Sequence, residues 1–164
     1  MRLRRVLVVT GITVSALACT PMAIADEPSD PEASKAAQSL VEQYTKAYDS
    51  HDPKAISMLF VPGGVFLPPN GAPMVQGREA IERSWAELFK NIGGHETISL
   101  KYAIPASKDA VVAISEFKIA GDGQNTGKTI SGRAALTLAK TADGWRYVSI
   151  VPQVQPPPAG APRQ

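Results

Sequence analysis

The sequence predicts an α+β fold in which three helices precede a four-stranded antiparallel sheet. Two observations lead to this prediction. Apolar residues recur at helical spacing through the first half of the 164-residue chain, and they alternate with polar residues through the second half. Because the helices come first and the strands follow, we expect the helices to cover one side of the sheet. The composition, 44% hydrophobic and 20% charged, is typical of a globular domain and argues against a disordered or fibrous chain.

The first predicted helix has Asp30 as its N-cap and Pro31 at the first helical position, where a missing N–H costs nothing, and it stops near Ser50-His51-Asp52. Its apolar residues share one face: Ala33, Ala37, Leu40, Val41, Tyr44, Ala47 and Tyr48. Asp52 is predicted to cap a shorter helix that begins at Pro53. The inward residues of that helix are Ile56, Leu59 and Phe60. A third helix should begin at Gly77 and end at Gly93-Gly94, with Trp85 on its apolar face.

The strands are predicted from their period of two. A short strand at residues 65–67 leads into a tight turn at Asn70-Gly71, and longer strands follow at 98–103, 110–119, 129–140 and 145–151. The alternation assigns these residues to the core face: Ile98, Leu100, Tyr102, Val111, Ala113, Ser115, Phe117, Ile130, Gly132, Ala134, Leu136, Leu138, Val148 and Ile150. Pro152 should end the last strand, so residues 152–164 are predicted to form an extended, mobile, proline-rich tail.

The N-terminus is typical of an export signal. Arginines precede an apolar run of 13 residues, and small residues follow up to Ala25, after which cleavage is expected. The run is shorter than the roughly 20 residues that span a bilayer, so no stable membrane span is expected. Residues 1–25 are therefore predicted to be a signal peptide and residues 26–33 a spacer, which gives a secreted or periplasmic protein. Lipid anchoring through Cys19, which follows Ala18 as in a bacterial lipoprotein signal, remains the alternative.

Charge and cysteine content exclude several kinds of site. The formal net charge is +2, but three arginines lie in the predicted signal, and without them 14 Lys and Arg face 15 Asp and Glu. No basic surface for nucleic acid is expected. After cleavage the chain has no cysteine, which excludes disulfides and thiolate-ligated metals.

Several short motifs occur in a familiar order: Ala47-Tyr48-Asp49-Ser50-His51-Asp52, Leu59-Phe60, Gly71 with Pro73, Gly77-Arg78-Glu79-Ala80-Ile81, Trp85, Ser107-Lys108-Asp109-Ala110 and Asp143-Gly144-Trp145. In this order and spacing, residues 34–151 resemble the SnoaL-like and SgcJ/EcaC-like members of the nuclear transport factor 2-like superfamily. The resemblance implies a cone: a curved sheet, mixed at its edge, wrapped around the long first helix. It also implies a pocket at the wide end and, in many members, a homodimer. The superfamily contains both enzymes and binding domains, so the fold does not select an activity.

The leading functional prediction is an exported domain, noncatalytic or weakly catalytic, that binds a small apolar molecule without a cofactor or metal. Proton-transfer enzymes of the superfamily usually carry an acidic residue before the first strand or on the pocket face of the sheet. Here the corresponding stretch is Pro62-Gly63-Gly64-Val65, and the predicted core face has no carboxyl group. The predicted ligand-binding residues are Tyr44, Tyr48, Phe66, Trp85, Tyr102 and Ser115.

Two other functions stay open. The chain could be an isomerase, cyclase or dehydratase for a polyketide-like or steroid-like substrate, with Tyr44 or Tyr48 acting beside Asp109 or Glu116. Alternation places Glu116 on the outer face between Lys101 and Arg133, which also fits a cross-strand charge ladder. The third reading is a homodimeric protein-interaction module. His51-Asp52 fits helix capping, and His95 has only Glu96 beside it, so neither histidine predicts a metal site.

Overall fold

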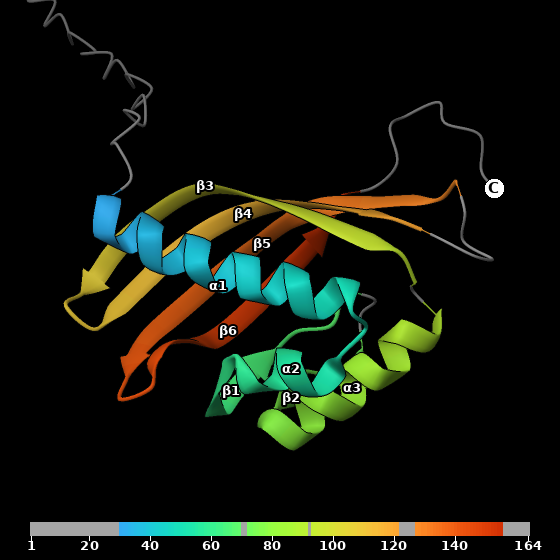
Figure 1. Ribbon diagram of the computed structural model, residues 1–164, viewed down its shortest axis with the longest axis horizontal. Helices are drawn as coiled ribbons and strands as arrows, with labels where there is room; N and C mark the ends of the chain where they lie inside the picture. Colours follow the sequence, from blue (N-terminus) through green and yellow to red (C-terminus); the bar gives the residue numbers. More distant parts are fainter. Residues whose placement is uncertain (1–29, 70–71, 92, 122–126, 156–164) are drawn as a thin grey trace, which may run out of the picture.

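The computed structural model describes residues 30–69, 72–91, 93–121 and 127–155. Within these residues three helices, α1 (Pro31–Asp49), α2 (Pro53–Met58) and α3 (Arg78–Asn91), accompany one six-stranded sheet (Figure 1). The strands are β1 (Phe60–Phe66), β2 (Val75–Gln76), β3 (His95–Ser107), β4 (Ala110–Ala120), β5 (Thr129–Thr141) and β6 (Gly144–Val154). Their order is β2-β1-β6-β5-β4-β3. Among these described strands only the β1–β6 pair is parallel, so the sheet is mixed.

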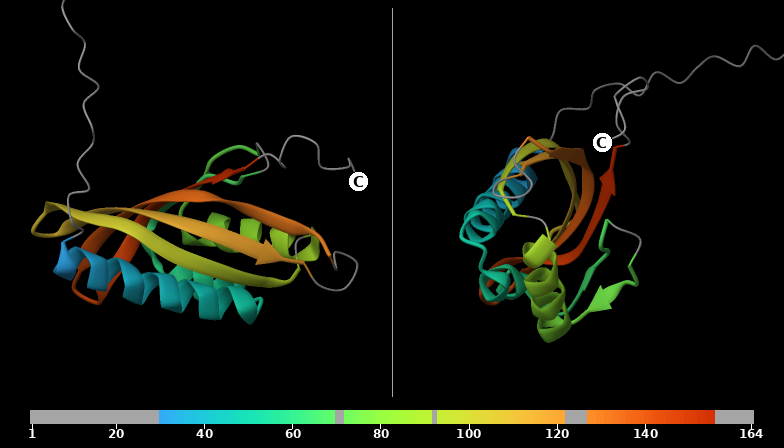
Figure 2. Two further views of the ribbon diagram at one scale, coloured as in Figure 1. Left: turned by 90° about the horizontal axis from the view of Figure 1, so that it is seen from above. Right: turned by 90° about the vertical axis from the view of Figure 1, so that its right-hand side faces the viewer.

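Both predicted helix caps are confirmed. The Asp30 carboxylate accepts the Ala33 N–H at 2.8 Å, and the Asp52 carboxylate accepts the Ala55 N–H at 2.9 Å. Each cap satisfies an N–H group that has no partner within its helix. The buried face of α1 lies along the concave side of the sheet, which is strongly curved but not closed (Figure 2). The expected α+β architecture, with a curved sheet around the first helix, is therefore confirmed.

The meander β3-β4-β5-β6 also forms as predicted, and the core faces of its two central strands are correct. β4 and β5 pair without interruption from Ala110↔Ala139 to Ala120↔Thr129. On this regular ladder the residues assigned to the core are buried, apart from the half-buried Ile130: Val111, Ala113, Ser115, Phe117, Gly132, Ala134, Leu136 and Leu138.

The predicted inward position of Tyr102 is wrong. The β3–β4 register shifts between Leu100 and Tyr102, so Tyr102 pairs with the outward-facing Ile114. Ala103, which pairs with Ala113, is fully buried in its place. A bulge of this kind adds one residue to one strand and reverses the faces beyond it.

A second register shift changes β6. It lies between Thr137 and Leu138 on the partner strand, and it puts Tyr147, 1% exposed, on the core face instead of the predicted Val148. Ile150 faces the core as expected.

The last strand is also longer than predicted, since β6 continues through Pro152 to Val154. The N–H of Gln155 reaches the Ser131 carbonyl on β5 at 2.8 Å, so by alternation the ring nitrogen of Pro152 faces away from β5. On that side β1 has already ended, because its last pair is Phe66↔Ile150. Pro152 therefore interrupts no ladder hydrogen bond, which is the condition under which a strand accepts proline. Residues 156–164 of the predicted tail lie outside the described residues.

The first half differs from expectation in its strands, because β2 (Val75–Gln76) was not predicted and β1 begins earlier than expected. Phe60 begins β1 and does not belong to α2, and β1 is longer than the predicted strand at 65–67. Gly77, with φ +85°, donates its N–H to the Gly64 carbonyl at 2.8 Å, and this contact ties the start of α3 to β1. The signal, Cys19 and the Asn70-Gly71 turn lie outside the described residues. In the described part of the chain no helix is both long and apolar enough to cross a bilayer.

Candidate functional site

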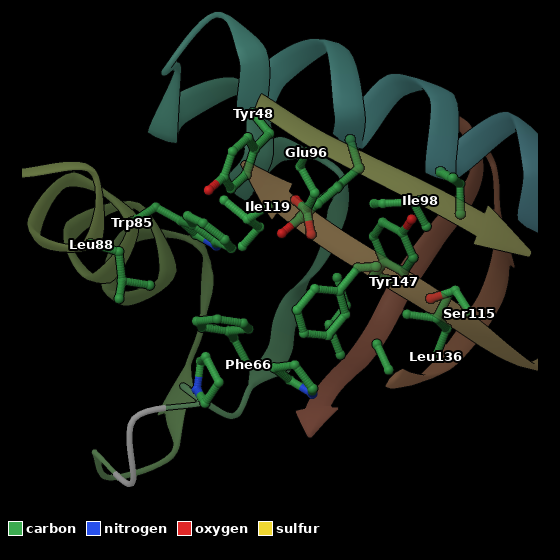
Figure 3. A pocket seen from close by; sticks show the side chains of 17 residues that line it. Tyr48, Phe66, Trp85, Leu88, Glu96, Ile98, Ser115, Ile119, Leu136 and Tyr147 are labelled. Carbon is green, nitrogen blue, oxygen red and sulfur yellow. The ribbon is translucent and has the colours of Figure 1, made fainter. Parts of the chain in front are cut away.

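A cavity lies between α1, α3 and the concave face of the sheet (Figure 3). Its volume is about 60 Å³, several times the space that one water molecule requires and less than the 150 Å³ of an engineered cavity that takes up benzene. Several lining residues are only half-buried: Pro69, Leu88, Ile98, Ile119 and Pro152. The cavity in this structure thus suits a small molecule, and a larger one needs these side chains to move apart.

Aromatic rings form most of the wall, with Trp85 of α3 among them. The Trp85 ring centroid lies 5.8 Å from both Tyr44 and Tyr48, edge to face, and 5.2 Å from Phe66. Tyr147 of β6 adds an edge-to-face contact with Tyr44 at 6.3 Å. Such contacts fix the rings relative to one another and leave a rigid apolar surface.

One carboxyl group enters this apolar wall. Glu96, the second residue of β3, is 7% exposed and is the only acidic residue among the described residues that line the cavity. Its carboxyl group points into the cavity toward Ile119 and Tyr147 (Figure 3). Burial first, and the Asp49 carboxylate second, raise the pKa of Glu96 to about 8. At neutral pH the buried group is therefore protonated and can donate a hydrogen bond.

Two buried polar atoms of the cavity have no hydrogen-bond partner among the described residues: Glu96 Oε2 and Trp85 Nε1. Glu96 comes from the start of β3 and Trp85 from the middle of α3, and both face the same space (Figure 3). A buried donor or acceptor left without a partner costs about 1–3 kcal/mol. A ligand or water that bonds to both atoms would recover this free energy.

The chain positions Glu96 through two neighbouring contacts. Gly94 has φ +119°, and a Cβ there would overlap the backbone oxygen of Ala120, so only glycine fits where β3 begins. Asp49, the last residue of α1, accepts the Glu96 backbone N–H at 3.2 Å. Together these contacts fix the first residues of β3 against the end of α1.

The prediction that the cavity wall carries no carboxyl group is wrong, and Glu96 is the residue that sequence reasoning missed. The predicted strand began at Ile98, although the same alternation extended backward by one step assigns Glu96 to the core face. An acidic residue in phase with Ile98 and Leu100 was thus a usable signal. Tyr147 was missed because the β6 bulge has no comparable signal in the sequence.

Five of the predicted ligand-binding residues line the cavity: Tyr44, Tyr48, Phe66, Trp85 and Ser115. Tyr102, on the outer face, does not. Burial, and then the charge of Glu96, raise the pKa of the Tyr44 hydroxyl well above its ordinary value, and the same causes raise the pKa of Tyr147. Both phenols are therefore neutral over the whole physiological range.

The two carboxylates considered for catalysis lie elsewhere. Asp109 is in the β3–β4 turn, where Lys108 approaches it at 3.1 Å. Glu116 lies on the outer face, 3.1 Å from Lys101 Nζ and 3.3 Å from Arg133 Nε. Hydrogen bonds from Lys101 and the charges of both cations lower the pKa of Glu116. The structure brings neither carboxylate together with Tyr44 or Tyr48.

His95 lies beside Asp49, with 3.4 Å between its Nδ1 and the carboxylate Oδ1. The described residues contain no group of three or more His, Cys, Asp or Glu side chains placed to hold a metal ion.

Several solved structures share this fold. A ketosteroid isomerase-like protein from Erwinia carotovora atroseptica aligns with a TM-score of 0.69 and 19% identity, over 78% of this chain and 100% of its own. The protein Aln2 from a Streptomyces species aligns with a TM-score of 0.66 and 18% identity, over 76% and 92%. A domain of unknown function with a cystatin-like fold from Nostoc punctiforme aligns with a TM-score of 0.68 and 12% identity, over 79% and 82%. No curated protein matches the chain in sequence.

The family comparison agrees with these structures. The profile of the SnoaL-like domain matches residues 37–152, which include most of α1, all six strands up to Pro152 and every residue placed in the cavity above. This chain therefore belongs to the SnoaL-like domain family, within the fold that its motif order predicted.

Proposed function

We propose that the cavity binds a small, mostly apolar, uncharged molecule that carries a hydrogen-bond acceptor, such as a ketone. The observation behind this proposal is the buried Glu96 carboxyl group, which points into an aromatic cavity and whose Oε2 has no hydrogen-bond partner among the described residues. Its raised pKa favours the protonated, donating form at neutral pH. The Trp85 indole N–H is a second donor toward the same space. One acceptor atom that receives both bonds would satisfy both groups, while the rest of the ligand would contact the rings.

Charge argues against an anionic ligand. The described lining residues include no Lys, Arg or His, so a carboxylate or phosphate would be buried without a counter-charge. The nearby Asp49 carboxylate and the negative faces of the rings add to this penalty.

The test is titration with acetophenone and benzoate, a matched pair of single-ring probes that enter only when the half-buried lining side chains move apart. The NMR signal of the Trp85 indole N–H reports binding. A Trp145→Phe variant identifies that signal, because Trp145 is the other tryptophan of the chain. We expect saturable shifts with acetophenone and at least about tenfold weaker binding of benzoate. Glu96→Gln keeps an N–H donor and should retain most of the affinity, whereas Glu96→Ala should lose it. Equal binding of both probes, or no saturation with either, would contradict the proposal.

A second candidate function is proton transfer, because the pKa of Glu96 lies close to the working range of a general acid or base. In this alternative the protein is an isomerase, cyclase or dehydratase, and Glu96 takes the role first considered for Asp109 and Glu116. A noncatalytic function was predicted because the cavity was expected to have no carboxyl group. The presence of Glu96 in the cavity removes that argument. Turnover of a ketone substrate that disappears in Glu96→Gln, while folding and binding persist, would distinguish an enzyme from a binding protein.

We also propose that the chain is exported after cleavage following Ala25, as a secreted or periplasmic protein, and that it acts as a homodimer. The outer face of the sheet supports the proposed homodimer. Ile104 and Val112, each more than a third exposed, pair across β3 and β4 and form a small apolar patch on the face that also carries the Glu116 ion pairs.

A further inference from the structure

Asp49 approaches Glu96 from outside the cavity. It ends α1 and lines a surface groove between that helix and the start of β3, with its side chain 39% exposed. Its Oδ1 accepts the Glu96 N–H and lies 3.4 Å from His95 Nδ1. Glu96 borders both this groove and the inner cavity. A solvent-facing carboxylate thus contacts the residue whose carboxyl group faces the ligand space.

The other groups around Glu96 offer little compensation for a negative charge on it. From α1 come the neutral phenols Tyr44 and Tyr48, from β6 the neutral phenol Tyr147, and from α3 the indole of Trp85. β4 contributes Ser115 and apolar side chains, and His95 on β3 lies nearest to Asp49. Lys46 and Glu42 of α1 line the outer groove and are exposed, so water screens their charges. The negative end of the α1 dipole also lies at Asp49.

We propose that Asp49, which lies in the outer groove, is a positioning residue for Glu96. It fixes the start of β3 and opposes a negative charge on the Glu96 carboxyl group. Asp49 thereby sets the upper pH limit of ligand binding in the cavity. This inference rests on the proposed function, because it concerns the donor form of Glu96. Its two parts are the backbone hydrogen bond that Asp49 Oδ1 accepts from Glu96 and the negative charge that the whole Asp49 carboxylate carries.

Substitutions at Asp49 separate the two parts. In Asp49→Asn the amide oxygen still accepts the Glu96 N–H, but the charge is gone. In Asp49→Ala both are lost. Glu42→Gln removes one charge from the same helix and the same groove at a residue whose carboxylate bonds to Gln38, so it is the matched control.

The first measurement is a ¹³C NMR titration of the Glu96 carboxyl in the empty protein. Burial and the Asp49 carboxylate raise the pKa of Glu96 to about 8. Asp49→Asn removes the second of these causes and should lower that pKa by about one unit. Glu42→Gln should leave it in place. This measurement needs no ligand.

The second measurement is acetophenone affinity from pH 6 to pH 9. At pH 6 the wild type, Asp49→Asn and Glu42→Gln should bind equally, since Glu96 is protonated in all three. At pH 8 the Asp49→Asn variant should bind about fivefold more weakly than the wild type, because one pKa unit reduces the protonated fraction by that factor. Asp49→Ala should show the same pH shift and also weaker binding at pH 6.

Two results would overturn the inference: an unshifted Glu96 titration in Asp49→Asn, or a loss of affinity in Asp49→Ala that is equal at every pH. Either would leave Asp49 with a purely structural role. A shifted titration without acetophenone binding in any variant would refute the proposed function and still support the control of Glu96 by Asp49.

Discussion

Tyr147 of β6 pairs with Leu138 of β5 and faces the core. Strict alternation from Ile150 would instead turn the neighbouring residue, Val148, inward. The register shift turns a large ring into the core, where it contacts Tyr44 and Phe60. A single irregularity between two strands therefore decides which side chain of β6 forms the wall of the cavity.

The first prediction concerns the stability that this ring contributes. Tyr147 is 1% exposed, so Tyr147→Ala should lower the free energy of unfolding by about 3–5 kcal/mol. Tyr147→Phe keeps the ring and should cost less than about 1.5 kcal/mol. Urea denaturation measures both. Val148→Ala serves as the control, because the bulge turns Val148 away from the core face; a larger effect there than at Tyr147 would contradict the register.

The second prediction concerns the pH dependence of stability. The pKa of Glu96 rises from 4.5 in the unfolded chain to about 8 in the folded protein. Between these values the folded state holds a proton that the unfolded state has released. The contribution of Glu96 to the free energy of unfolding is thus fully present below pH 4.5. It falls by about 1.4 kcal/mol per pH unit above that value and is lost as the pH rises through 8.

Glu96→Gln cannot ionise, so its stability should stay level over the same pH window and exceed that of the wild type at pH 8. Urea denaturation at pH 5, 6, 7 and 8 provides the comparison. Glu42→Gln, altered at an exposed carboxylate, should follow the wild-type curve. Parallel curves for the wild type and Glu96→Gln would show that Glu96 is ionised in the folded protein.

The third prediction concerns the glycine that precedes β3. A side chain at residue 94 would overlap the Ala120 backbone, and the positive φ of this residue favours glycine. Gly94→Ala should therefore destabilise the fold by about 1–3 kcal/mol or more. It should also displace Glu96 and weaken acetophenone binding at all pH values. Gly63→Ala is the control, since a Cβ there meets nothing within 4 Å. Equal stability of the two variants would contradict the close approach.

The fourth prediction tests the proposed dimer. Arg133→Glu places a negative charge beside Glu116 on the outer face and should shift the protein from dimer to monomer in light scattering across a dilution series. Folding should persist, because an exposed ion pair contributes only about 0–1 kcal/mol. Lys108→Glu, at the exposed β3–β4 turn, should leave the dimer intact. A wild-type protein that is monomeric at every concentration would rule out the dimer.

The fifth prediction tests export. After expression in a bacterial host, the mass of the purified protein should correspond to a chain that begins at Asp26. A chain that begins at an acylated Cys19 would indicate the lipoprotein alternative, and Cys19→Ser would then abolish the lipid-modified form. Recovery of the uncleaved chain from the cytoplasm would contradict both routes.

Local signals in the sequence predict most of the fold. Asp30 and Asp52 lie directly before proline, and each caps the helix that follows. β4 and β5 keep a strict alternation because they pair without a shift along their shared ladder. These features depend on neighbours in the chain, so a single sequence is sufficient to find them.

The candidate site depended less on such signals. The side chains of Tyr44, Tyr48 and Trp85 could be assigned to the core from helical spacing, and they line the cavity. Tyr102 could not be placed correctly, because a bulge leaves no mark in the pattern of apolar residues. Glu96 was in phase with its strand, but a carboxyl group at a strand end is usually exposed, and only the fold shows that it is buried.

The sequence by itself determined the order of helices and strands, their caps and the faces of the regular strands, because these follow from contacts between residues close along the chain or from simple periodicity. Only the tertiary structure decided that Glu96, Trp85 and Tyr147 line one cavity and that Asp49 contacts Glu96 from outside it. Those residues come from four separate elements, and their meeting depends on the curvature of the sheet, two register shifts and the close approach of Gly94 to β4. The free energy that buries a carboxyl group there is supplied by the packing of the whole domain, which no local pattern encodes.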